Sequence, residues 1–240
     1  MSDTLWLRLR APFAGYRWLQ AGVYRATSPV PPPSAAWGLL LNLAHIETRD
    51  LAATRKQSAL ATLRRADPPP LQLAIGAVRA SDKGVLYQQL HSYPVGASGK
   101  ELAKGTHGAK YWIAPVRREL LVDLDVVVGA RSLDPDLLAR VVDGLAGSLD
   151  QPRYGLPFAG DNNCLFDRID VLDRPHEATW YSPVDPDDTE RRDSCRLTVS
   201  IDRAEASATR APLFAPGPRA PEPPPEAWVW VPEPPAAATA

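Results

Sequence analysis

The sequence contains few of the residues from which metal and disulfide sites are built. Among its 240 residues are two cysteines, Cys164 and Cys195, which lie far apart and form no C-x-x-C motif. This spacing argues against a zinc ribbon and against a disulfide framework. The four histidines are also isolated in the sequence, so a metal site made from them would need distant segments to converge. We therefore expect neither a metal nor a cofactor.

Motifs of several large enzyme families are also absent from the sequence. It has no Walker lysine loop, no G-x-G-x-x-G after a predicted strand, no H-E-x-x-H and no G-x-S-x-G. Asp123 and Asp125 alternate onto one side of a predicted strand, where paired carboxylates could do acid–base work. A strand face with solvated charges explains this pair better.

Long apolar runs are missing as well. No stretch is long enough to cross a membrane, and the N-terminal residues lack the apolar core of a signal peptide. We therefore expect a cytoplasmic protein with reduced thiols and no membrane partner. With 45% hydrophobic and 23% charged residues, the chain has the composition of one large or two small globular domains.

Charge is distributed unevenly along the chain, although the formal net charge is −1. Residues 1–120 carry 16 basic and 7 acidic side chains, whereas residues 121–240 carry 11 basic and 21 acidic ones. A basic half of this kind indicates a local anionic partner. Attraction between the two halves of the chain explains the same asymmetry equally well.

Hydrophobic periodicity predicts alternating strands and helices in the first 172 residues. In order, these are a strand at 5–10, a helix at 34–46, strands at 71–79, 85–93 and 119–128, a helix at 132–145 and a strand at 166–172. Asp134 is the expected N-cap of the second helix, with Pro135 at its first position. The order is compatible with the β-α-β-β-α-β arrangement of a ferredoxin-like α+β fold, whose helices cover one face of the sheet.

Composition divides the chain into three expected regions. Residues 1–173 are expected to form the ferredoxin-like domain, from which a basic, glycine-rich flap at about residues 94–110 projects. Residues 174–203 are expected to form a small, acidic, β-rich extension. Residues 204–240 hold 10 of the 26 prolines and are expected to form an extended Pro/Ala-rich tail. The apolar stretch Ala227–Val231 in this tail would dock on this chain or on a neighbouring protein.

Basic and aromatic residues are interspersed in the first half of the chain. Single-stranded nucleic acid is bound by cations that contact phosphates and by flat side chains that stack on bases. The candidates before the first helix are Trp6, Arg8, Arg10, Tyr16, Arg17, Trp18, Tyr24 and Arg25. The lysines of the flap at 94–110 strengthen this interpretation, because few apolar residues there could hold the flap on a core. Core packing or solvation explains any one of these residues equally well.

Two segments resemble the Cas-five family of CRISPR-associated proteins. Residues 7–47, LRLRAPFAGYRWLQAGVYRATSPVPPPSAAWGLLLNLAHIE, combine a strand, an Arg/Thr-bearing loop, a proline-rich entry and a helix of the form S-A-x-x-G-L-L, as in that family's N-terminal signature. Residues 153–172, RYGLPFAGDNNCLFDRIDVL, resemble the family's later glycine-containing segment. The resemblance spans about residues 5–175 and does not include the acidic segment or the tail.

This resemblance implies a ferredoxin-like core with a β-hairpin thumb, in a non-catalytic subunit of Cascade, the surveillance complex of type I CRISPR systems in antiviral defence. Such a subunit binds the 5′ handle of the crRNA and contacts the Cas-seven backbone subunit and the large Cas-eight-type subunit, and the complex binds target DNA. The resemblance implies a handle-binding pocket between Arg10 and Arg25 and a thumb at residues 94–110. The expected RNA-binding residues are Arg10, Tyr16, Arg17, Arg25, Thr27, Ser34, Lys100, Lys104, His107 and Lys110.

Two alternative functions remain open at this point. In one branch of the Cas-five family the protein itself cuts precursor crRNA without metal, using a Tyr/Lys/His group. Lys104, His107, Lys110 and Tyr111 are close together here, but the local sequence of that branch is not present. Alternatively, the chain is a structural adaptor whose basic half meets an acidic protein, without direct RNA recognition.

The first strand has two different faces. Leu5, Leu7 and Leu9 are expected to pack beneath the two helices. On the opposite face, we expect Trp6 to be covered by the C-terminal part of the chain. Arg10, which is nearest the following loop, is expected to contact RNA. Arg8 has no predicted place.

Overall fold

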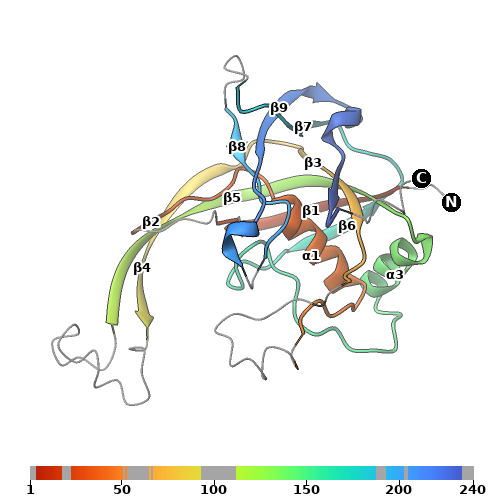
Figure 1. Ribbon diagram of the computed structural model, residues 1–240, viewed down its shortest axis with the longest axis horizontal. Coiled ribbons are helices and arrows are strands. Elements are labelled where there is room, and N and C mark those ends of the chain that lie inside the picture. Colours follow the sequence, from red (N-terminus) through yellow and green to blue (C-terminus); the bar gives the residue numbers. More distant parts are fainter. Residues whose placement is uncertain are drawn as a thin grey trace.

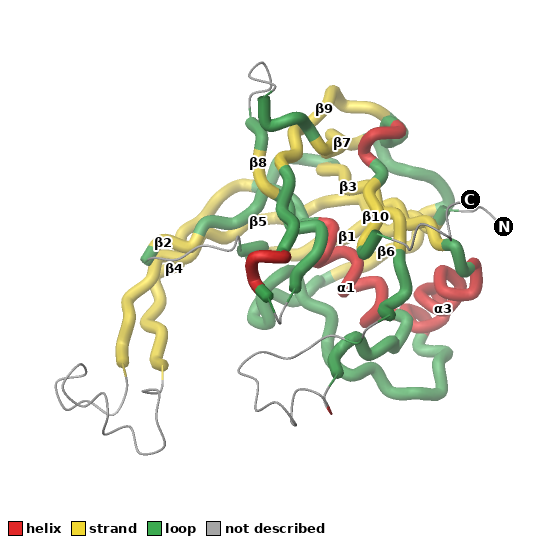
Figure 2. The backbone as a smooth tube through the Cα atoms, in the orientation of Figure 1, coloured by secondary structure: helices red, strands yellow, loops and turns green. Residues whose placement is uncertain are grey.

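The structure is a computed structural model that describes residues 4–17, 23–50, 52, 65, 67–92, 112–187, 193–202 and 205–233. Within these ranges, the helices α1 (Pro33–Leu43) and α3 (Pro135–Ala146) pack on one ten-stranded sheet (Figures 1 and 2). Its strands are β1 (Leu5–Ala14), β2 (Tyr24–Arg25), β3 (Leu71–Ala77), β4 (Asp82–Ser92), β5 (Trp112–Ser132), β6 (Arg168–Leu172), β7 (Ala178–Pro183), β8 (Cys195–Arg196), β9 (Leu213–Ala220) and β10 (Val229–Val231). The fold is therefore of the α+β class that the sequence predicts.

Strand β5 organises the sheet. The main strand order is β6-β1-β5-β3-β7-β9-β8, and β2, β4 and β10 pair outside this path. The second half of β5 lies between β1 and β3, whereas its first half pairs with β4 in a long antiparallel hairpin. Figure 1 shows this hairpin projecting from the body of the molecule. In the sequence, the thumb predicted at residues 94–110 falls between β4 and β5. It is outside the described residues.

Helices α1 and α3 pack against one face of the sheet, where Leu7, Leu9 and the inward residues of β5 form the main core. The expectation that the leucine face of β1 lies in this core is confirmed. Asp134 is the N-cap of α3, as predicted, because its Oδ1 accepts a hydrogen bond from the backbone nitrogen of Asp136. The helices approach closely at Gly144, where a Cβ would lie 1.7 Å from the carbonyl oxygen of Leu43.

A second, smaller core lies on the other face of the sheet. Trp6 is 7% exposed, and its ring lies 6.0 Å from that of Trp180 and 5.8 Å from that of Trp228, both in edge-on contacts. Arg131 lies over the ring of Trp228, 3.8 Å from its centre. The expectation that C-terminal residues cover Trp6 is therefore confirmed.

The region predicted to be an extended tail contributes two strands to the sheet, so the expectation of a tail is wrong for residues 213–220. Strand β9 pairs with β7, and β10 pairs with β3, so the apolar stretch at Ala227–Val231 docks on this chain. Prolines are tolerated in β9 because the pairing is interrupted there. Gly217 and Pro218 together lie opposite Trp180, as in a β-bulge. The boundaries at residues 173 and 203 stay a prediction.

Two local predictions differ from the structure for identifiable reasons. Helix α1 ends at Leu43 rather than Ile46, because His45 has a φ of 56° and leaves the helical conformation. Asp125 is buried rather than solvated, because Arg8 on β1 pairs with it. Asp123 is exposed, as expected for a residue on a solvated face.

Neither a membrane-spanning helix nor a metal-binding cluster occurs in the part of the chain that the structure describes. None of its helices combines the length and apolar character needed to cross a bilayer. No group of three or more potential metal ligands is found there either.

Candidate nucleic-acid interface

The loop after β1 folds back on itself beside the base of the β4–β5 hairpin. The backbone nitrogen of Tyr16 donates to Oγ1 of Thr27 at 2.9 Å, and that of Ser28 donates to the Tyr16 carbonyl at 2.8 Å. Arg17 and Thr27 form an isolated β-bridge. The structure thus brings together three of the predicted RNA-binding residues, Tyr16, Arg17 and Thr27.

Glu119 on β5 fixes the far side of this loop. Its carboxylate accepts hydrogen bonds from the backbone nitrogen of Thr27 at 3.0 Å and from the Tyr24 hydroxyl at 3.1 Å. The hydrogen bond to Glu119 raises the pKa of Tyr24. Lys83 on β4 lies 3.7 Å from the same carboxylate. The loop is therefore attached to β5 through Glu119, whose carboxylate also contacts β4.

Strand β2 places a fourth predicted residue, Arg25, beside β5. Tyr24 and Arg25 pair in parallel with Arg117 and Arg118, and the Arg117 nitrogen donates to the Val23 carbonyl at 2.7 Å. We call Arg17, Arg25 and Arg118 the arginine cluster. Burial lowers the pKa of Arg118, and the positive charges of Arg17 and Arg25 lower it further. An anion bound at this cluster would relieve the repulsion between the guanidinium groups.

Arg118 is held in place from two directions. It is 9% exposed, its Nη1 donates to Oε1 of Gln88 at 2.8 Å, and its Nη2 pairs with the carboxylate of Asp161. Asp161 also accepts from the backbone nitrogen of Asn163 at 3.0 Å, which fixes the turn that carries it. The cluster therefore rests on a rigid support built from β4, β5 and the segment at 158–163.

This segment belongs to the second region of family resemblance, and its glycine has a specific role. Gly160 has a φ of 79°, and a Cβ there would lie 2.5 Å from Cδ1 of Tyr16 and 2.6 Å from the Gly15 carbonyl oxygen. The backbone nitrogen of Gly15 donates to the Ala159 carbonyl at 2.9 Å. A side chain at position 160 would therefore push the loop after β1 away from its support.

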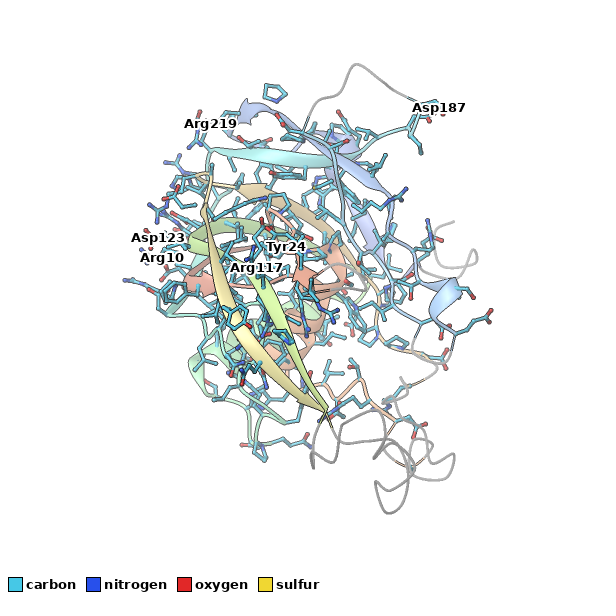
Figure 3. All side chains as sticks on the ribbon, turned by 90° about the vertical axis from the view of Figure 1, so that its left-hand side faces the viewer. Arg10, Tyr24, Arg117, Asp123, Asp187 and Arg219 are labelled. Carbon is cyan, nitrogen blue, oxygen red and sulfur yellow. The ribbon has the colours of Figure 1, made fainter. Side chains whose placement is uncertain are left out.

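The remaining predicted RNA-binding residues lie elsewhere. Arg10 pairs with Asp170 on β6 at 3.1 Å, and Arg168 pairs with the same carboxylate at 2.7 Å. Figure 3 shows Arg10 separated from Tyr24 and Arg117. Lys100, Lys104, His107 and Lys110 lie outside the described residues. Their role in RNA binding, like that of Arg10, stays a prediction.

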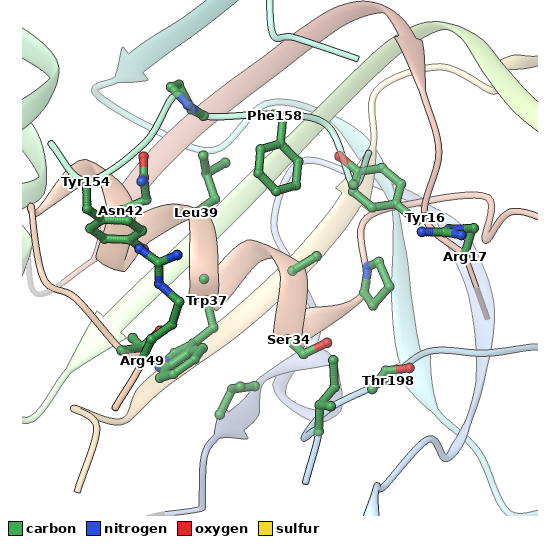
Figure 4. Close-up of a pocket in the computed structure, with 18 of the residues that line it drawn as sticks. Tyr16, Arg17, Ser34, Trp37, Leu39, Asn42, Arg49, Tyr154, Phe158 and Thr198 are labelled. Atoms are coloured by element: carbon green, nitrogen blue, oxygen red, sulfur yellow. The ribbon is translucent and has the colours of Figure 1, made fainter. Parts of the chain in front are cut away.

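A groove of about 480 Å³ runs along α1, and we call it the α1 groove (Figure 4). Three predicted residues line it: Ser34 at the beginning of α1, Tyr16, and Arg17 of the arginine cluster. Sequence reasoning missed Arg118, Glu119 and Asp161, and also the groove residues Asn42, Arg49 and Tyr154. The adjacent Arg117 and Arg118 at the start of the predicted strand were the one signal that could have revealed the cluster.

Comparison with solved structures extends the description of the fold. No family model and no curated protein matches the sequence. A chain of a structure described as "CRISPR RNA-guided surveillance complex" superposes with a TM-score of 0.54 at 14% sequence identity, covering 93% of this chain and 95% of the other. The two chains share a fold. A second structure, "Crystal structure of Cas protein", gives a TM-score of 0.46 at 12% identity, covering 89% of this chain and 92% of that one.

Proposed function

We propose that this protein is a non-catalytic, RNA-binding subunit of a type I CRISPR surveillance complex, and that it binds the 5′ handle of the crRNA. The observation that carries the proposal is the arginine cluster, with Arg17 and Arg25 on the loop after β1 and the buried Arg118 beneath them. The charges of Arg17 and Arg25 lie near enough to Arg118 to lower its pKa, and arginine contacts phosphates with charge-assisted hydrogen bonds.

The architecture supports this proposal. We interpret β1, α1, β3, β5, α3 and β6 as a ferredoxin-like β-α-β-β-α-β core, supported by the neighbouring order β6-β1-β5-β3 and the helices on one face. Folds of this kind commonly bind single-stranded RNA. The fold shared with a chain of a CRISPR RNA-guided surveillance complex supports assembly into such a complex. We further propose that this protein contacts the Cas-seven backbone subunit and the large Cas-eight-type subunit of the complex. A cytoplasmic location and a role in antiviral defence are part of the same proposal.

Binding of labelled RNA tests the handle proposal directly. The probe is a fluorescein-labelled RNA that begins with a repeat-derived handle, compared with one of scrambled handle sequence. The double variant Arg17→Gln/Arg25→Gln should weaken binding and lower the slope of log K against log salt by about 0.7 for each lost phosphate contact. Equal affinity of the wild-type protein for the two RNAs would disprove handle recognition.

A matched control uses two arginines remote from the arginine cluster. Arg168 and Arg210 have side chains that are 65% and 56% exposed and pair with Asp170 and Glu233, respectively. Arg168→Gln/Arg210→Gln removes the same charge and should leave the affinity and the salt slope within about twofold of wild type. If both double variants weaken binding equally, overall charge and not the arginine cluster binds the RNA.

The proposal that the protein is not an enzyme has its own test. Incubation of the wild-type protein with repeat-containing precursor RNA in EDTA should give no cleavage products. Cleavage that is lost in His107→Ala would instead support the metal-independent endoribonuclease alternative.

A further inference from the structure

The two ends of the α1 groove differ in their hydrogen-bonding character. The groove follows one face of α1 through Ser34, Gly38 and Asn42, which are spaced four residues apart and together span about 12 Å of helix axis. Its volume of about 480 Å³ is in the range of pockets that bind small molecules. Figure 4 shows Arg49, Tyr154 and Trp37 at one end and Tyr16 and Arg17 at the other.

The end near Asn42 offers flat aromatic surfaces and a hydrogen-bond acceptor. Trp37 and Tyr154 line it, and the Arg49 guanidinium lies over the Tyr154 ring at 5.3 Å. Asn42 is 7% exposed, and its Nδ2 donates to the Gly155 carbonyl at 3.1 Å. Its Oδ1 has no hydrogen-bond partner among the described residues. A buried acceptor without a donor is costly, so this end favours a planar ring that carries N–H groups.

The opposite end offers hydrogen-bond donors and positive charge. Arg17 and Ser34 line it, and Ser34 lies in the first turn of α1, where the helix dipole favours an anion. The hydroxyl of Tyr16 is buried and has no partner in the described part of the chain. Arg17 also belongs to the arginine cluster, so this end of the groove is continuous with the RNA-binding surface proposed above.

We propose that the α1 groove binds one nucleotide of single-stranded RNA, with the base at the Asn42 end and its phosphate at the Arg17 end. This inference rests on the proposed RNA-binding function. A nucleotide has the matching polarity, because its planar base carries N–H donors and its phosphate is an anion. The acidic Glu47 at the Asn42 end does not oppose binding, since Arg49 neutralises it in an ion pair of 2.5 Å.

Gly38 allows the groove to be blocked without removing a contact. A Cβ built at this position meets no atom within 4 Å, so a larger side chain has space to enter the groove. Gly38→Leu also replaces glycine within a helix by a better helix former, which favours correct folding. Ala139→Leu adds a leucine to α3, away from the groove, and is the charge-neutral control.

Fluorescence anisotropy with the handle RNA provides the first readout. Gly38→Leu should weaken binding by about five- to a hundredfold, the contribution of one stacked base, and should leave the salt slope unchanged because no cation is lost. Arg49→Gln changes a half-exposed side chain and should also weaken RNA binding, as Gly38→Leu does. Ala139→Leu should bind as the wild-type protein does.

Ultraviolet crosslinking followed by mass spectrometry provides the second readout. RNA should crosslink to peptides containing Trp37 or Tyr154 in the wild-type protein, and this crosslink should be lost in Gly38→Leu. Wild-type affinity of Gly38→Leu, or RNA crosslinks that avoid both peptides, would overturn the groove inference and leave handle binding by the arginine cluster intact. Failure of the wild-type protein to bind the RNA would overturn the proposed function, and the groove inference with it.

Discussion

Arg8 on β1 and Asp125 on β5 form a two-bonded ion pair, with Nε–Oδ1 at 2.8 Å and Nη2–Oδ2 at 2.7 Å. Asp125 is 6% exposed, so its charge is removed from water and depends on the arginine. The pair joins two neighbouring strands at the face opposite the helices. It also provides a place for Arg8, which could not be assigned from local sequence signals.

Removal of one partner of this pair should destabilise the protein more than removal of both. Arg8→Leu leaves the buried carboxylate with only the longer contact to Arg79, at 4.0 Å, and should lower the free energy of unfolding by about 2–3 kcal/mol, given the partial exposure of Arg8. The double variant Arg8→Leu/Asp125→Leu should lose less of the free energy of unfolding than Arg8→Leu does. Urea denaturation of the three proteins measures both differences, and a double variant less stable than Arg8→Leu would contradict the expectation.

A side chain at Gly160 should disturb the support of the arginine cluster. Gly160→Ala combines a positive φ with a contact of 2.5 Å to Tyr16, and should cost about 2–3 kcal/mol of unfolding free energy. Gly155→Ala is the control, because a Cβ there meets no atom within 4 Å and its φ is not in the left-handed region. Thermal unfolding compares the two variants, and equal melting temperatures would show that the contact at Gly160 is relaxed at little cost.

The C-terminal strands should contribute to the stability of the whole sheet. Trp228→Ala removes one of the two rings that cover Trp6, together with the contact to Arg131, and should lower the free energy of unfolding by about 3 kcal/mol. Trp6 should become more accessible to acrylamide quenching. A variant as stable as the wild-type protein would mean that this region does not stabilise the sheet.

The buried thiol of Cys195 should make the stability of the folded protein depend on pH in the alkaline range. Burial raises the pKa of Cys195 to about 11, from an ordinary value of 9.0. The folded protein holds this proton more tightly than the unfolded chain, so the associated stability is complete below pH 9 and is lost as the pH rises through about 11. Denaturation curves recorded between pH 9 and pH 11 should show that the free energy of unfolding declines less in Cys195→Ala than in the wild-type protein. Equal declines would contradict the assignment.

Alkylation gives an independent check of the same thiol. At pH 8 only about one thousandth of a thiol with this pKa is ionised, so iodoacetamide should react slowly with folded Cys195 and rapidly after unfolding. Rapid modification of the folded protein would show that the thiol is accessible and its pKa lower.

The local signals in the sequence were sufficient for the elements of the first 172 residues. The leucine face of β1, the N-cap at Asp134 and the two helices follow from periodicity and capping, which depend on residues close in the sequence. For the same reason Trp6 could be assigned to the face opposite the helices. The length of β5 could not be foreseen, because its first half contains Pro115 and the charged run Arg117–Glu119 and is stabilised by pairing with β4.

The tertiary structure decided where charges and distant segments meet. The proline content of residues 204–240 argued for an unpaired tail, yet β9 and β10 pair with β7 and β3, since long-range pairing and burial outweigh local propensity. Asp125 was expected on a solvated face, and Asp161 was one acidic residue among many, until folding placed Arg8 and Arg118 against them. The sequence by itself determined the helices, the core face and the basic character of the first half of the chain. The three-dimensional packing alone brought Arg17 and Arg25 near Arg118 and placed Arg17 in the α1 groove, because electrostatic contacts depend on distance in space and not on spacing along the chain.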